Sequence, residues 1–194
     1  MIKAILLAAG LSKRIGHENK LTKIYKKKPL INYCLNSLHK SKVNKVIIVL
    51  GYQHKEIKKI IKKNRKNIFI FNKDYRKGMA LSIKAGLKKI SRNDKGFIVV
   101  HSDMPFIKSS DINKIYSSIR LKKFLVYALK FKNKVGNPIG FDISLMKRFK
   151  NIKGNFGAKF MVKRLKSRTK FIKTSSIKAF KDFDIVSDFR NWFI

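Results

Sequence analysis

Residues 4–20 read AILLAAGLSKRIGHENK and contain the transition that decides the fold. The apolar run over residues 4–9 is typical of a strand that is buried on both faces of a parallel sheet. The run ends at Gly10, and the loop that follows contains Ser12, Lys13, Arg14, Gly16 and Lys20. Glycine lets backbone N–H groups turn outward, and arginine and lysine neutralise phosphate. The stretch therefore predicts a first strand followed by a phosphate-binding loop.

Two common phosphate loops do not match this stretch. A P-loop has four residues between its glycines and then Lys-Ser/Thr, whereas five residues separate Gly10 from Gly16 and His17 follows. The dinucleotide pattern G-x-G-x-x-G is also missing after Gly10. An ordinary turn with solvated lysines remains the alternative interpretation.

The rest of the chain alternates between strand-like and helix-like segments. Short aliphatic runs occupy residues 45–50, 68–71, 97–100 and 124–129. Helical spacing of apolar residues occurs over residues 30–39, 56–63, 80–90 and 111–119. This order predicts a Rossmann-like, three-layer α/β/α sandwich with a mainly parallel sheet and its ligand at the carboxyl ends of the strands. The less regular segment 132–154 is expected to form a lobe on the substrate side.

Composition favours a single domain over residues 1–194 with a solvated, lysine-rich surface. It also favours a location in the reducing cytoplasm. The net charge is +38, from 48 basic and 10 acidic residues. The lysines are spread along the whole chain, which disfavours a dedicated nucleic-acid-binding module, the alternative that such a charge raises. The single cysteine, Cys34, cannot form an internal disulfide. No stretch approaches the ~20 apolar residues that cross a membrane.

Asp103 is the carboxylate best placed by the sequence for metal binding. It follows the apolar run at residues 97–100, in His-Ser-Asp-Met-Pro, where the carboxyl end of a strand is expected. Carboxylate oxygens are the ligands that Mg²⁺ prefers, and a magnesium ion neutralises charge in nucleotide transfer. A turn-forming role for Asp103 is the structural alternative.

Residues 7–21, with the pattern L-A-A-G-x-S-x-R-x-G-x-x-N-K-L, resemble the signature of the MobA-like nucleotidyltransferases. The resemblance continues, in order, over residues 72–87, 99–105, 136–141, 154–159 and 182–189. It implies the fold of the nucleotide-diphospho-sugar transferases. It also implies that the first loop wraps the triphosphate of an NTP, with nucleotide contacts from Leu7, Ala8, Ala9, Gly10, Ser12, Arg14, Lys20, Gly78 and Ser82.

The resemblance also assigns catalytic, metal and acceptor residues. It implies catalytic roles for Arg14, Lys20 and Asp103, although Ser102 replaces the glycine that usually precedes the aspartate. Asp103 and Asp184 are the expected magnesium ligands, with Asp182 as an alternative to Asp184. The expected acceptor contacts are Asn137, Pro138 and Lys159, and Asn155 replaces an acidic residue of the family pattern. Asp188 is interpreted as a charge that stabilises the N-terminus of the last helix.

The activity implied is Mg²⁺-dependent transfer of CMP from CTP to molybdopterin, with release of pyrophosphate. A molybdenum hydroxylase or its chaperone would be the protein partner. Other readings keep the fold: a guanylyltransferase, a transferase acting on a sugar or polyol phosphate, and a non-catalytic member that binds cofactor.

Overall fold

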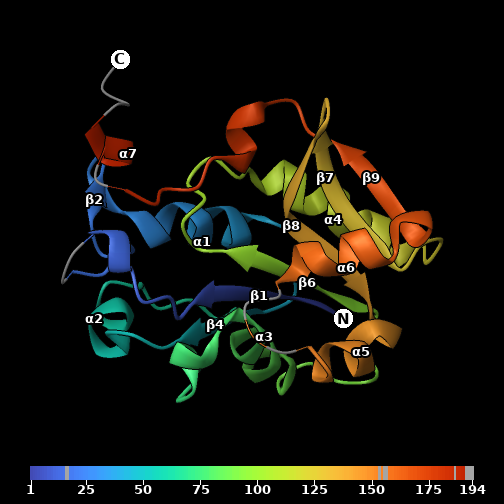
Figure 1. Cartoon of the computed structure of the whole chain (residues 1–194), viewed down its shortest axis with the longest axis horizontal. Helices are drawn as coiled ribbons and strands as arrows, with labels where there is room; N and C mark the ends of the chain where they lie inside the picture. Colours follow the sequence, from blue (N-terminus) through green and yellow to red (C-terminus); the bar gives the residue numbers. More distant parts are fainter. Residues whose placement is uncertain (16–17, 153, 155–156, 186, 191–194) are drawn as a thin grey trace.

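The computed structural model describes residues 1–15, 18–152, 154, 157–185 and 187–190. Its centre is a seven-stranded sheet in the order β5-β4-β1-β6-β8-β7-β9 (Figure 1). The strands are β1 Ile2–Ala8, β4 Val46–Leu50, β5 Asn67–Phe71, β6 Gly96–His101, β7 Val126–Phe131, β8 Lys134–Asp142 and β9 Thr169–Lys173. Only β8 runs antiparallel to its neighbours in this sheet, so the mainly parallel sheet is confirmed.

Helices cover both faces of the sheet and make the three layers expected from the sequence. The helices are α1 Leu30–Lys40, α2 His54–Lys59, α3 Met79–Leu87, α4 Ser109–Arg120, α5 Met146–Lys150, α6 Ala158–Arg164 and α7 Ser187–Arg190. Apolar residues of α1, α2 and α4 share one core cluster, and those of α3, α5 and α6 share the other. In Figure 1, α1 and α4 lie on one side of the sheet and α3 and α5 on the other.

Alternation along the central strands explains why two cores form. In β1, Leu6 and Ala8 pack with α1, whereas Ile5 packs on the opposite face. All three side chains are almost completely buried. Because successive strand residues point to opposite faces, a continuous apolar run supplies both cores.

The expectation for residues 132–154 was wrong in its main part. Residues 134–142 form β8, which pairs with both β6 and β7 inside the main sheet. The sequence there, KVGNPIGFD, contains two glycines and a proline, which weaken the signal of a buried strand. Gly140 and Gly136 are close-packed: a Cβ would lie 2.5 Å from Ile115 and 2.6 Å from Phe180, respectively.

Two shorter features complete the carboxyl edge of the sheet. The hairpin of β2 (Ile24–Tyr25) and β3 (Lys28–Pro29) follows the first loop. After β9, the chain returns to this edge, where the backbone N–H of Phe183 donates to the carbonyl of Asp103 at 3.0 Å. In the described part of the chain, no helix has the length and apolar character needed to span a membrane.

Candidate active site

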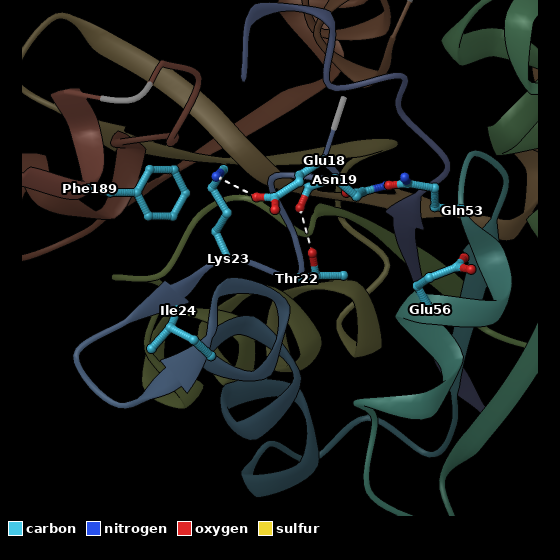
Figure 2. Close-up of a pocket in the computed structure, with 8 residues that line it drawn as sticks. All are labelled: Glu18, Asn19, Thr22, Lys23, Ile24, Gln53, Glu56 and Phe189. Carbon is cyan, nitrogen blue, oxygen red and sulfur yellow. Dashed lines mark hydrogen bonds and ion pairs between the residues drawn. The ribbon is translucent and has the colours of Figure 1, made fainter. Parts of the chain in front are cut away.

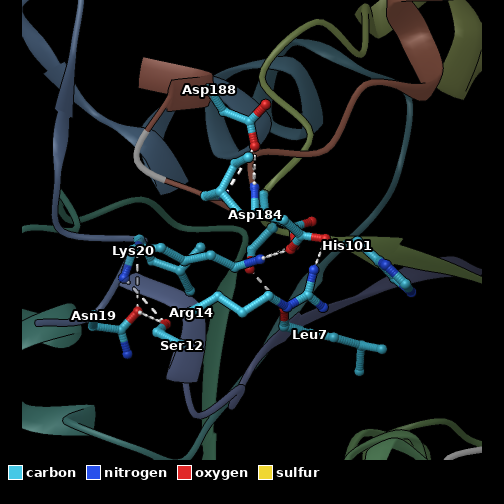
Figure 3. A network of polar contacts seen from close by, with 12 residues as sticks. Leu7, Ser12, Arg14, Asn19, Lys20, His101, Asp184 and Asp188 are labelled. Carbon is cyan, nitrogen blue, oxygen red and sulfur yellow. Dashed lines mark hydrogen bonds and ion pairs between the residues drawn. The ribbon is translucent and has the colours of Figure 1, made fainter. Parts of the chain in front are cut away.

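The loop after β1 is held together by two polar side chains, those of Ser12 and Asn19 (Figure 3). Ser12 Oγ accepts a hydrogen bond from the backbone N–H of Lys20 at 3.1 Å and donates to Asn19 Oδ1 at 3.3 Å. Asn19 is 1% exposed, and its amide also donates to the carbonyl of Tyr52 at 3.2 Å. Asn19 thus ties the loop to the segment after β4, a role that sequence reasoning missed although the residue lies within the quoted motif.

The conformational role expected of Gly10 was wrong. Gly10 lacks a positive φ, and a Cβ there would meet nothing within 4 Å. Among the described residues of this loop, Ser12 has the positive φ, 53°. Its hydroxyl bonds to Asn19 and Lys20 stabilise a conformation that a non-glycine residue rarely adopts. Gly16 and His17 lie outside the described residues.

Lys20 joins two carboxylates, one from the middle of the chain and one from its C-terminal part. Its Nζ lies 2.6 Å from Asp103 Oδ2 and 2.7 Å from Asp184 Oδ1. Arg14 adds a third contact, with Nη1 3.1 Å from Asp184 Oδ2. The four side chains therefore form one charged cluster at the carboxyl edge of the sheet.

The pKa values follow from this cluster. Burial alone would lower the pKa of Lys20, but Asp103 and Asp184 outweigh it and raise the pKa above its usual value. Burial would raise the pKa of Asp184, but its hydrogen bond to Lys20 and the charge of Arg14 hold that pKa below the ordinary range. Both groups are therefore charged at neutral pH.

Asp184 is positioned by the residue before it. Phe183 is fully buried, and its ring packs against Tyr25 of β2 at 4.9 Å, Phe106 at 5.9 Å and Phe189 of α7 at 5.2 Å between ring centroids. Its backbone N–H donates to the carbonyl of Asp103. The aromatic cluster and this hydrogen bond help to hold Asp184 beside Asp103.

Asp188 reinforces the same turn. Its Oδ2 accepts hydrogen bonds from the backbone N–H groups of Asp184 at 2.7 Å and Ile185 at 3.0 Å, and Lys181 pairs with Oδ1 at 2.5 Å. Burial would raise the pKa of Asp188, but these partners lower it overall. Asp188 thus stabilises the turn that carries Asp184, a more specific role than the helix charge expected from the sequence.

A cavity of about 520 Å³ opens beside the charged cluster. It is lined by ten of the residues expected from the sequence: Leu7, Ala9, Gly10, Ser12, Arg14, Lys20, Gly78, Ser82, Asp103 and Asp184. We call it the nucleotide cavity. Ala8 is not part of this lining, because strand alternation directs its side chain into the core on the side of α1.

The far wall of the nucleotide cavity comes from the start of α3. Gly78 has φ 116°, a backbone conformation that favours glycine. Ser82 is buried, and its hydroxyl accepts a hydrogen bond from Asn72 at 3.1 Å. Ser102, which replaces the usual glycine, donates its hydroxyl to the carbonyl of Leu7 at 2.7 Å. Its side chain is therefore bonded to β1.

A second cavity of about 240 Å³ adjoins the first, and Met79, His101 and Asp182 line both. It also contains Asn137 and Lys159, two of the three expected acceptor contacts. Pro138 is buried beside Asn137 and is not part of this lining. Asn155 lies outside the described residues. The sequence analysis did not predict that His101 lines both cavities, because a histidine at the end of an apolar strand is not part of any recognisable motif.

A third hollow, of about 590 Å³, lies on the outer side of the loop between β2, α2 and α7 (Figure 2). Its lining carries the carboxylates of Glu18 and Glu56, and Glu18 pairs with Lys23 at 2.7 Å. The charged cluster of Lys20, Asp103 and Asp184 lines the nucleotide cavity instead. The cations and carboxylates expected at a phosphate site therefore line the nucleotide cavity and not this third hollow.

The carboxylate pair has the donors that a hard divalent cation requires. Asp103 Oδ1 is buried and has no hydrogen-bond partner among the described residues. No group of three or more His, Cys, Asp or Glu side chains in the described ranges could hold a metal, so the candidate site is this pair alone. Two carboxylates leave coordination positions for phosphate oxygens and water, as Mg²⁺ sites in phosphoryl-transfer proteins do.

Comparison with known proteins relates this geometry to a family. The chain is 30% identical over 141 residues to 2-C-methyl-D-erythritol 4-phosphate cytidylyltransferase of Lachnoclostridium phytofermentans, covering 69% of this chain and 58% of that protein. It is 26% identical over 115 residues to the bifunctional protein GlmU of Caldicellulosiruptor saccharolyticus, covering 57% of this chain and 24% of that protein. The chain thus spans only part of the length of these curated relatives.

Solved structures share the fold at low sequence identity. The Rv0371c protein of Mycobacterium tuberculosis superimposes with a TM-score of 0.83 at 17% identity, over 97% of this chain and 96% of that chain. Its complex with manganese superimposes with a TM-score of 0.75 at 16% identity, over the same shares of the two chains. The sequence profile described as the MobA-like NTP transferase domain matches residues 4–169. Because this match covers most of the chain, the protein belongs to the MobA-like NTP transferase family.

Proposed function

We propose that this protein is a divalent-metal-dependent nucleotidyltransferase, which transfers CMP from CTP to molybdopterin and releases pyrophosphate. One observation carries the proposal. Two carboxylates, Asp103 and Asp184, meet on a single lysine beside a cavity that the family's phosphate loop lines. This arrangement suits a triphosphate and a hard cation, and we assign the acceptor to the adjoining cavity, which Asn137 and Lys159 line.

The reaction needs positioning and charge neutralisation. An acceptor phosphate oxygen attacks the α-phosphorus, a new phosphoanhydride bond forms, and the bond to the β-phosphate breaks to release pyrophosphate. A phosphate oxygen is already nucleophilic at neutral pH, so the protein mainly has to hold the reactants in line. A divalent ion, Mg²⁺ in our proposal, would stabilise charge on the α-phosphate when held by Asp103 and Asp184.

Lys20 and Arg14 have two tasks in this scheme. Without nucleotide, they balance the charge of the two carboxylates. A divalent ion on those carboxylates would replace them as the counter-charge. Both cations would then be available to the triphosphate, Arg14 as a bidentate donor and Lys20 as a point charge.

The preference for CTP rests on two kinds of support. The L-A-A-G and N-K-L steps at residues 7–10 and 19–21 resemble the cytidylyl branch of the family. The relative from Lachnoclostridium is named a cytidylyltransferase. Its name also supports a second candidate acceptor, a polyol phosphate, whose phosphate oxygen could attack the α-phosphorus in the same way.

The proposal also covers location and partners. We place the protein in the cytoplasm, with a molybdenum hydroxylase or its chaperone as the recipient of the product. The reduced environment agrees with Cys34, which is a free and fully buried thiol whose pKa is raised by burial.

The test is binding of CTP, GTP and ATP with and without Mg²⁺, at low and high salt, by wild type and Asp103→Asn. We expect selective, Mg²⁺-dependent CTP binding that Asp103→Asn abolishes. Turnover with molybdopterin and with 2-C-methyl-D-erythritol 4-phosphate then separates the two acceptors. Equal, purely salt-sensitive binding of every polyanion, nucleic acid included, would contradict the proposal and leave the charge of +38 to explain.

A further inference from the structure

His101 stands in the wall between the two cavities. It is the last residue of β6, two positions before Asp103, and it lines both the nucleotide cavity and the second cavity. Its Nε2 lies 3.2 Å from Nδ2 of Asn137 in β8. Because β8 pairs with β6, this side-chain contact spans two neighbouring strands at the edge where ligands are expected.

The roles of the two atoms in this contact depend on the tautomer of the histidine ring, and the arrangement with Nδ2 of Asn137 facing the ring requires one tautomer. An amide nitrogen can only donate a hydrogen bond, so Nε2 of His101 accepts and the ring proton lies on Nδ1. In this arrangement the Asn137 amide turns its nitrogen toward the His101 ring and its oxygen away from the ring.

That orientation leaves the amide oxygen unused. Asn137 is 4% exposed, and its Oδ1 is buried without a hydrogen-bond partner in the described part of the chain. Buried polar atoms in folded proteins nearly always have partners, so an exception in a cavity wall calls for an explanation. A ligand that donates a hydrogen bond to Oδ1 supplies one.

We propose that His101 is a positioning residue for the acceptor: it orients Asn137 so that Oδ1 accepts a hydrogen bond from an N–H or O–H group of the molecule in the second cavity. This inference rests on the proposed function for the identity of that molecule as the acceptor. It narrows the acceptor to phosphate esters whose other end carries such a donor. A site built to pair with a donor rejects analogues that lack it, because its own polar atom would stay unpaired.

The first experiment examines the protein without any ligand. Long-range ¹H–¹⁵N spectra of the histidine rings report which nitrogen carries the proton. We expect the Nδ1–H tautomer for His101, and side-chain amide signals of Asn137 that are protected from exchange. An Nε2–H tautomer would overturn the proposal, since the amide would then have to present its oxygen to the ring.

Two substitutions separate positioning from packing. His101→Gln can place a side-chain oxygen where Nε2 accepts, whereas His101→Leu offers no acceptor. We expect protection of the Asn137 amide to persist in the Gln variant and to be lost in the Leu variant. Thermal unfolding checks that each variant is folded. If protection is unchanged in a folded Leu variant, or is equally lost in both, His101 does not orient Asn137.

The second experiment uses a matched pair of heteroaromatic probes. Lumazine carries two N–H groups, and 1,3-dimethyllumazine carries a methyl group on each of the same nitrogens. We expect lumazine to bind about 10-fold or more tightly than its dimethyl analogue, as is typical when one hydrogen bond to a buried oxygen is lost. Asn137→Ala should remove this difference.

The outcomes are distinct from those of the functional test. No binding of lumazine, or equal affinities for the two probes in wild type, would overturn the proposal. Both experiments are independent of turnover. Failure of CMP transfer alone would count against the proposed function and leave the result for His101 and Asn137 intact.

Discussion

Strand β6 is flanked by two aspartates, each paired with a lysine, and the two pairs differ in one instructive respect. Asp94, before the strand, has both oxygens engaged: Lys3 Nζ at 2.8 Å and the N–H of Ser91 at 2.9 Å on Oδ2, and the terminal amine of Met1 at 3.4 Å on Oδ1. Asp103, after the strand, has one oxygen on Lys20 and one with no partner in the described structure.

The lysines differ in the same way. Lys3 contacts one carboxylate and the carbonyl of Lys89 at 3.1 Å, so its partners are all parts of the fold near the amino end of β6. Lys20 is shared by two carboxylates and borders a cavity. A satisfied pair at the amino ends of the strands stabilises the fold. The pair at the carboxyl ends leaves one oxygen of Asp103 without a partner in the described structure, at the edge where ligands bind in α/β sheets.

Exchanging each aspartate for its amide should give opposite results. For Asp103→Asn, we expect turnover to fall by about 10³-fold or more, since an amide is a poor ligand for a divalent cation and leaves the reacting phosphate less neutralised. For Asp94→Asn, turnover should stay within about twofold, while the free energy of unfolding falls by about 1–3 kcal/mol as charged hydrogen bonds are lost. Steady-state kinetics and urea denaturation measure the two effects. The comparison fails if Asp103→Asn keeps a tenth of the turnover.

Removing the shared cation should weaken nucleotide binding specifically. For Lys20→Met, we expect the affinity for CTP to fall by about 10- to 100-fold, because a charge-assisted contact to phosphate is lost. Lys23→Met is the matched control, since Lys23 forms a pair with Glu18, whose side chain is 73% exposed, and such pairs contribute little. Calorimetric titration with CTP and Mg²⁺ measures both. Similar losses in the two variants would mean that general surface charge binds the nucleotide.

Substituting Phe183, the buried residue before Asp184, tests how the second carboxylate is positioned. For Phe183→Leu, we expect about 1 kcal/mol lower stability from imperfect repacking, together with about tenfold lower turnover as Asp184 loses its place beside Asp103. Phe171→Leu is the control, because Phe171 is 37% exposed on β9. Turnover that follows stability equally in both variants would show that Phe183 contributes packing only.

The pH dependence of stability should identify Asp94 as the structural member of the comparison. Burial would raise the pKa of Asp94, but Lys3 and the N–H of Ser91 lower it below its usual value. Its contribution is therefore present above the unfolded pKa of about 3.9 and is lost as the pH falls through the lower, folded pKa. Denaturation at several pH values should show wild type and Asp94→Asn converging by about 1 kcal/mol or more in strong acid. A constant difference down to that range would exclude this titration.

Much of the architecture could be predicted from the sequence because its signals are local. Strands β1, β4, β5 and β6 each begin within two residues of the start of the apolar run that predicted them. Four helices were also expected, although α2 ends at Lys59, four residues before the predicted end. β8 was missed, because its glycines and proline fit the sheet only through the close packing of Gly136 and Gly140.

The site was predictable to the extent that its residues lie in contiguous motifs. Lys20 and Asp103 each follow a recognisable strand, and the family resemblance over residues 182–189 pointed to Asp184. The supports of these residues were not predictable. Asn19 bonds to Tyr52, and Phe183 packs against Tyr25 and Phe106, contacts that link segments distant in the sequence.

The sequence by itself determined the layered α/β fold, the position of the loop after β1 and the family, because periodicity and contiguous motifs depend on neighbouring residues. Only the tertiary structure decided which polar atoms are satisfied. Three contacts arise from chain segments that meet only after folding. They are the sharing of Lys20 by Asp103 and Asp184, the ion pair of Lys3 with Asp94, and the contact of His101 with Asn137. Hydrogen-bond satisfaction is a property of three-dimensional neighbours, and here it distinguishes Asp94, whose oxygens are both bonded, from Asp103, which we propose as a metal ligand.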